Sequence, residues 1–101
     1  MLYRNYRAPK GGEVDLVCRD GDTLVFAEVK TRSSEAFGTP AEAVTRSKQH
    51  LIARGALAWL RLLGNPDIPF RFDIIEIRMT GKKPEINVIR NAFTLPEPYR
   101  Y

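Results

Sequence analysis

Three side chains suited to phosphodiester chemistry lie in two short segments of the chain. Asp15 lies in GGEVDLV, and Glu28 and Lys30 lie in LVFAEVKTR. Carboxylate oxygens are ligands that Mg²⁺ prefers, and this ion usually takes others from water and a phosphate. A lysine beside the ion can hold or deprotonate the attacking water, or stabilise negative charge on the phosphate. These residues predict a Mg²⁺ (or Mn²⁺) cofactor, with Glu13 available as a third carboxylate.

Two neighbouring strands must bring these segments together. Residues 13–19 alternate acidic and apolar side chains before turning wholly apolar, and residues 23–31 are rich in β-branched and aromatic side chains. The dipeptide Asp20-Gly21 between them is a strong hairpin signal. A two-residue turn there predicts three opposed pairs, which are Arg19 with Asp22, Asp15 with Phe26, and Glu13 with Glu28.

The acids and the lysine are therefore expected on one face of this hairpin. Directly opposed residues share a face, and Lys30 lies on the same face as Glu28, about 7 Å farther along the strand. Opposed like charges destabilise a sheet, and a divalent cation would reverse that effect. The other face is expected to face the core, with Val14, Leu16, Val25, Ala27 and Val29.

A long helix is expected after the hairpin. Residues 33–39 read as a loop, Pro40 suits the first turn of a helix, and residues 41–63 keep helical periodicity. Further strands are expected at residues 2–7, 70–79 and 86–89. The order β-β-β-α-β-β predicts an α/β fold in which a long crossover helix covers a mixed sheet on at least one face.

One basic residue, Lys48, falls in the apolar stripe of this helix. It should point toward the sheet, where it can reach the carboxylates or a phosphate, or else extend along its own stem to solvent. Gln49 lies one step off the stripe. The outer face is either a phosphate-tracking stripe or an ordinary charged surface, and it holds Arg46, His50, Arg54 and Arg61. The stripe itself contains Val44, Leu51, Ile52, Gly55, Trp59 and Leu62.

Composition favours one folded domain with a polyanionic partner. The 101 residues suffice for one core, and a formal charge of +4 favours nucleic acid. The lone Cys18 fits a reducing cytoplasm, and we expect no signal peptide and no membrane span.

Beyond these patterns, the segments carry a resemblance to known nucleases. Asp15 followed by Glu28-Val29-Lys30 resembles the PD-(D/E)xK signature of restriction-endonuclease-like enzymes. GGEVDLV, LVFAEVKTR, FGTPAEAV and RFDII resemble the YraN-type (UPF0102) family of predicted endonucleases, which is similar in motif to archaeal Holliday-junction resolvases. The resemblance implies metal binding by Asp15, Glu28 and the backbone carbonyl of Val29, and it makes Lys30 the catalytic lysine. It also implies a restriction-endonuclease-like fold over residues 1–101.

One departure from the family weakens this interpretation. Relatives usually carry an additional amino-terminal helix with another acid, and this chain begins after the position of that helix. Its absence puts a complete site in doubt and would leave an apolar surface for another chain to cover.

The leading hypothesis is a metal-dependent endonuclease that hydrolyses phosphodiesters in branched or damaged DNA, as a homodimer if both strands are cut. The alternative is a nucleic-acid-binding module of the same fold with little or no cleavage activity. Residues flanking the site are the candidates for DNA contacts, namely Arg7, Lys10, Arg32, Ser33, Lys48 and Gln49. A simpler interpretation of the acids is a solvated sheet face with cross-strand ion pairs. For Asp73, an ion pair with Arg71 is the plain explanation.

Overall fold

A computed structural model describes residues 1–33 and 40–97, apart from the side chains of residues 40, 41 and 80. It confirms the expected β-β-β-α-β-β layout. The five strands are β1 (Tyr3–Arg7), β2 (Glu13–Asp20), β3 (Thr23–Ser33), β4 (Phe70–Thr80) and β5 (Lys83–Phe93), and the helices are α1 (Pro40–Ala43) and α2 (Arg46–Leu62).

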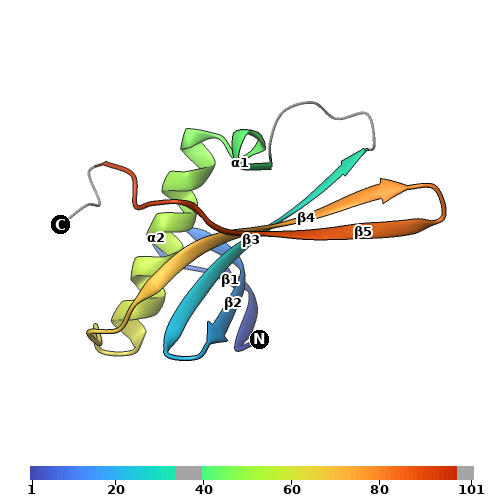
Figure 1. Cartoon of the computed structure of the whole chain (residues 1–101). Coiled ribbons are helices and arrows are strands. Elements are labelled where there is room, and N and C mark those ends of the chain that lie inside the picture. The colour runs from blue at the N-terminus through green and yellow to red at the C-terminus, as the bar shows by residue number, and fades with distance from the viewer. Residues whose placement is uncertain (34–39, 98–101) are drawn as a thin grey trace.

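The five strands form a single mixed sheet in sequence order, β1-β2-β3-β4-β5. Only β3 and β4 pair in parallel, because the helical segment crosses over between them, whereas the other neighbours are antiparallel. The far halves of β4 and β5 extend well beyond α2 as a projecting hairpin (Figure 1). Among the described residues, no helix is long and apolar enough to cross a membrane.

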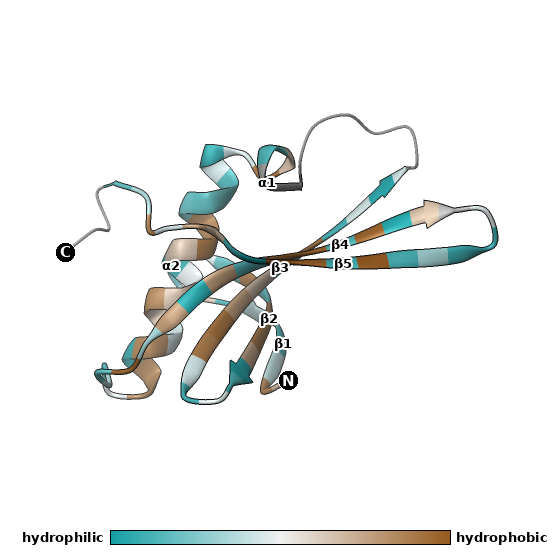
Figure 2. Cartoon of the chain, in the orientation of Figure 1, coloured by the Kyte–Doolittle hydropathy of each residue, from teal (hydrophilic) through white to brown (hydrophobic). Residues whose placement is uncertain are grey.

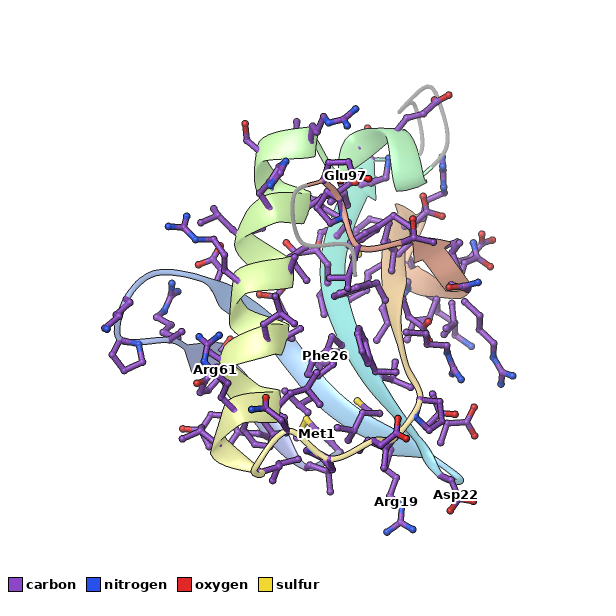
Figure 3. The ribbon with its side chains drawn as sticks, turned by 90° about the vertical axis from the view of Figure 1, so that its left-hand side faces the viewer. Met1, Arg19, Asp22, Phe26, Arg61 and Glu97 are labelled. Atoms are coloured by element: carbon purple, nitrogen blue, oxygen red, sulfur yellow. The ribbon has the colours of Figure 1, made fainter. Side chains whose placement is uncertain are left out.

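The core lies between α2 and one face of the sheet. Phe26, Phe72 and Ile74 contribute from β3 and β4, and Ile52 and Ala56 contribute from α2. Figure 3 shows Phe26 between the helix and the sheet, and Figure 2 shows the apolar colouring concentrated where the strands pass the helix. Even-numbered residues of β3 therefore face the helix, and Glu28 is one of them.

The predicted hairpin register is wrong by two positions, although its parity is right. Asp20 opposes Thr23 and Val17 opposes Phe26, so the two turn residues are Gly21 and Asp22. Gly21 has a φ of 60°, a backbone conformation that glycine adopts without strain. Asp15 therefore does not oppose Phe26, and Glu13 does not oppose Glu28. Because the shift is even, each side chain keeps the face that was expected for it.

The predicted apolar face of the hairpin is confirmed in part, since Val14, Val25 and Ala27 are buried, but the charged face is not separate from the core. Val14 and Val17 are both in the core, although strict alternation would place them on opposite faces. The backbone is irregular nearby, since Asn5, in the neighbouring strand β1, has a φ of 54°. Val25 and Ala27 are buried but lie outside the helix-facing core cluster. The site face and the core face are thus one continuous face.

The predicted single helix is interrupted at Thr45. Thr45 has extended backbone angles and caps α2, with its hydroxyl accepting a hydrogen bond from the Lys48 N–H at 3.2 Å. A helix cannot run through a residue in that conformation, so residues 41–63 divide into α1 and α2. Leu62, placed in the buried stripe by the periodicity, is 70% exposed. The loop expected at 33–39 lies outside the described residues beyond Ser33.

Helix α2 rests directly on the backbone of β2. A Cβ atom added to Gly55 would come within 2.9 Å of backbone atoms of Glu13, and one added to Gly12 would come within 2.5 Å of the Gly55 nitrogen. Contacts this short leave no room for any side chain at either glycine. The helix is therefore held at a fixed height over the strand that carries Glu13 and Asp15.

Candidate functional site

Asp15 and Glu28 come together between β2 and β3. The Val29 backbone N–H donates a hydrogen bond of 2.9 Å to Oδ2 of Asp15, which ties the Asp15 side chain to the strand segment that carries Glu28. Asp15 is half-buried, whereas Glu28 is buried. The two acids that the sequence singled out are therefore neighbours.

Glu28 is a buried carboxyl group that is only partly neutralised. Its side chain is 5% exposed, and Lys48 Nζ lies 3.4 Å from Oε1. The other oxygen, Oε2, is buried and has no hydrogen-bond partner. Burial raises the pKa of Glu28 to about 7, and the charge of Asp15 adds to this rise while Lys48 opposes it. Such an orphaned oxygen marks a place where a cation would be stabilised.

Glu13 is also in this cluster, but its two oxygens are already bonded. Oε2 accepts a hydrogen bond of 2.7 Å from Arg7 Nη1, and Oε1 accepts one from Lys48 Nζ. The bond from Lys48 is the main reason that the pKa of Glu13 is lowered, and Arg7 contributes as well. Glu13 thus differs sharply from Glu28, in which one oxygen has no partner.

Lys48 points to the sheet, as its place in the apolar stripe predicts. Its ammonium group bridges Glu13 of β2 and Glu28 of β3. Burial by itself would lower the pKa of Lys48, but the two carboxylates outweigh that effect and raise it. The lysine is therefore charged at neutral pH, and it links α2 to both strands of the site.

Lys30 lies two residues beyond Glu28 on β3, half-buried, with its Cα opposite that of Glu76 in β4. Within residues 1–33 and 40–97, its ammonium group makes no ion pair. The lysine of the expected motif is thus close along the strand to the acid pair, and it is not engaged by any described carboxylate.

The remaining DNA-contact candidates occupy different environments. Arg32 is 8% exposed at its side chain and pairs with the buried Glu76 at 3.2 Å. Gln49 donates to the Val44 carbonyl, and the exposed Lys10 lines a shallow surface hollow beside α2. The exposed Ser33 accepts a bond from Arg78 through its carbonyl. Of these candidates, Arg32 is the one that the structure places inside a buried polar cluster.

Two polar clusters on β4 are built around buried acids. Arg71 bonds to the buried Asp73, as expected from the sequence, and it also pairs with Asp20 at 3.0 Å. The buried Glu76 was not singled out from the sequence, although an acid in an apolar strand is itself a signal of a paired buried charge. It accepts bonds from Arg32, Arg78 and Asn87. All the described contacts of these clusters are internal ion pairs and hydrogen bonds.

The donor set fits a hard cation only in part. Among residues 1–33 and 40–97 there is no group of three or more acids, histidines or cysteines placed to hold a metal ion. Asp15 and the orphaned Glu28 oxygen supply two carboxylates, and Val29, whose N–H bonds to Asp15, directly follows Glu28 in sequence. Mg²⁺ commonly binds through one or two carboxylates with waters and substrate phosphates. The residues present therefore fit such an ion when substrate and water complete its shell.

Comparison with known proteins places the chain in a family. The model of "Uncharacterised protein family UPF0102" matches residues 1–77. A UPF0102 protein of Geobacter metallireducens is 50% identical over 95 residues, which cover 94% of this chain and 77% of the relative. One of Geobacter sulfurreducens is 52% identical over 96 residues (94% and 74%), and one of Caldicellulosiruptor saccharolyticus is 43% identical over 95 residues (92% and 80%). The chain therefore belongs to the UPF0102 family.

Proposed function

We propose that this protein is a divalent-metal-dependent endonuclease that hydrolyses phosphodiester bonds in DNA. The observation that carries the proposal is the buried Glu28 carboxyl, with one oxygen unpartnered and with Asp15 as its neighbour. An ionised pair of this kind is unstable without a cation. The formal charge of +4 supports a polyanionic substrate.

Asp15, Glu28 and the Val29 carbonyl would hold Mg²⁺ or Mn²⁺. When bound, the ion would polarise the scissile phosphate and lower the pKa of a water molecule. Lys30, which makes no ion pair within the described residues, would orient the attacking water or stabilise charge on the phosphate oxygens. Arg7, which pairs with Glu13 at the site, and the exposed Lys10 would contact the DNA backbone.

Nicking of supercoiled plasmid and cleavage of a four-way junction with Mn²⁺ test this proposal. The wild type is expected to cut, whereas Asp15→Asn and Lys30→Ala are expected to bind DNA and to cut at least a hundredfold more slowly, about 3 kcal/mol in activation free energy. The exposed Lys83→Ala on β5 is the matched control for Lys30→Ala. Identical product traces from the wild type and both site variants would overturn the proposal.

A second candidate is a DNA-binding module of the same fold with little cleavage activity. The small number of acids favours it, because the described residues hold no cluster of three potential metal ligands. Such a module would show salt-dependent DNA affinity that Asp15→Asn leaves unchanged, and no nicking at any Mn²⁺ concentration. For the endonuclease of the first proposal, we expect branched or damaged DNA as the substrate. Cutting both strands of a junction would require a homodimer.

A further inference from the structure

Glu13 and Glu28 share one lysine but differ in what else they bind. Each oxygen of Glu13 has a cationic partner, Arg7 on Oε2 and Lys48 on Oε1. Glu28 has Lys48 at 3.4 Å on Oε1 and no partner on its buried Oε2. A metal ion at Glu13 would have to displace two existing ion pairs, whereas a metal ion at Glu28 would satisfy an orphaned atom.

Lys48 is held in place more firmly than a surface lysine usually is. Its backbone N–H donates to the Thr45 hydroxyl at the start of α2. About two turns farther along, Gly55 lets the helix pack directly on the backbone of Glu13, which sets the distance between α2 and β2. The Lys48 side chain is 26% exposed, so it lies partly open to solvent at the edge of the site.

An ammonium group carries three hydrogens, and the two carboxylates engage it from the protein side. In the protein without a metal ion, it is the cation nearest to Glu28 among the described ion pairs. Since Lys48 and a divalent ion would neutralise the same carboxyl group, they must compete for it.

We propose that Glu13 is a positioning residue that holds Lys48 as the internal counter-ion of Glu28, and that Lys48 passes from Glu28 to a DNA phosphate when a divalent ion binds. This inference rests on the proposed function, because it requires a metal ion at Asp15 and Glu28. On this inference, Glu13 positions Lys48 and is not one of the metal ligands.

Calorimetric titration of the full chain with Mn²⁺ at pH 8 separates these roles. Lys48→Met removes the competing cation, so Mn²⁺ affinity is expected to rise by about three- to tenfold. The Mn²⁺ affinity of Glu13→Gln is expected to stay within about threefold of the wild-type value. Residues that only contact the groups around a metal affect its affinity less than the ligands do. Asp15→Asn is expected to abolish binding.

The double variant Glu13→Gln/Lys48→Met tests whether Glu13 acts through the lysine. If it does, Glu13→Gln will have no further effect on Mn²⁺ affinity or DNA affinity once Lys48 is gone. Lys48→Met should also reduce the slope of log DNA affinity against log salt concentration by the amount expected for about one lost phosphate contact. Lys48→Arg should keep the wild-type slope. Circular dichroism confirms that each variant is folded, and the exposed Lys83→Met and Glu85→Gln on β5 control for the charge changes.

Two results would overturn the inference while leaving the proposed function standing. One is Mn²⁺ affinity that falls tenfold or more in Glu13→Gln, in either background, which would make Glu13 a ligand. The other is Mn²⁺ affinity that is unchanged or lower in folded Lys48→Met. Failure of the wild type to bind Mn²⁺ at all would overturn both proposals.

Discussion

The Nζ atom of Lys48 in α2 lies 3.4 Å from Oε1 of Glu28 in β3, so an ion pair joins the helix to the middle strand of the sheet. This pair neutralises only one side of the carboxyl group, because Oε2 of Glu28 is buried without a partner. The ionised form of Glu28 therefore costs folding free energy when no metal ion is bound.

The stability of the metal-free protein should depend on the protonation of Glu28. Its pKa is about 7 in the folded protein and near 4.5 when exposed. Between these values the folded state binds more protons, so the Glu28 contribution to the free energy of unfolding falls as pH rises, by up to roughly 3 kcal/mol. Glu28→Gln should therefore have a higher free energy of unfolding than the wild type at pH 8, and this difference should be smaller at pH 5. Urea unfolding in EDTA measures both values.

Glu85→Gln serves as the control, since Glu85 is exposed on β5. The difference in free energy of unfolding between Glu85→Gln and the wild type should be the same at pH 5 and pH 8 within about 0.5 kcal/mol. Parallel pH profiles for Glu28→Gln and the wild type would show that Glu28 is not a destabilised buried acid.

Close packing of α2 on β2 makes Gly55 intolerant of a side chain. Alanine normally favours a helix over glycine by about 1 kcal/mol. Here its Cβ would meet the Glu13 backbone at 2.9 Å, so Gly55→Ala should instead destabilise the protein by about 1–3 kcal/mol. Thermal melting measures this, with the exposed helical Ser47→Ala as control. A stabilised Gly55→Ala would mean that the helix can move away from the strand.

The cap of α2 should contribute to stability and to the placement of Lys48. Thr45→Ala removes the acceptor of the Lys48 N–H and should cost about 1 kcal/mol. Thr45→Ser keeps the acceptor and should stay close to the wild type in chemical unfolding. Equal losses in both variants would point to the Thr45 methyl group as the source of the stabilisation.

Arg32 should act in folding and not in DNA binding. It pairs with the buried Glu76, so Arg32→Met would leave Glu76 with one less partner and should lower Tm by roughly 5–15 °C. DNA affinity at a fixed salt concentration should be unchanged at temperatures where the variant is folded. The exposed Arg90→Met on β5 is the charge control. A normal Tm with reduced DNA affinity would restore Arg32 as a phosphate contact.

Much of the fold follows from local patterns, because alternation and turn residues mark the strands. The hairpin turn was misplaced by one residue, yet Asp15 and Glu28 still meet, since an even shift in register preserves the faces of a strand. The core face of β2 was not predictable, because Val14 and Val17 both lie in the core and β2 therefore departs from strict alternation. Thr45 could have been identified as a cap from its residue type, but the apolar periodicity runs through it.

The inward direction of Lys48 was predictable from the helical wheel, whereas its partners were not. Which carboxylates it reaches depends on the height of α2 over β2, and the contact of Gly55 with Glu13 sets that height. In the same way, the pairing of Arg32 with Glu76 joins residues that are distant in sequence and meet only because β3 and β4 are parallel neighbours. Tertiary contacts of this kind leave no local signal in the sequence.

The central claim is that Asp15 and Glu28 bind one divalent cation. Crystals soaked in Mn²⁺ test it most directly, through an anomalous difference map. We predict one strong peak in contact with Asp15 and Glu28, lost in Asp15→Asn, with Lys48 no longer paired to Glu28. A map with no peak between these two carboxyl groups at saturating Mn²⁺ would contradict the account.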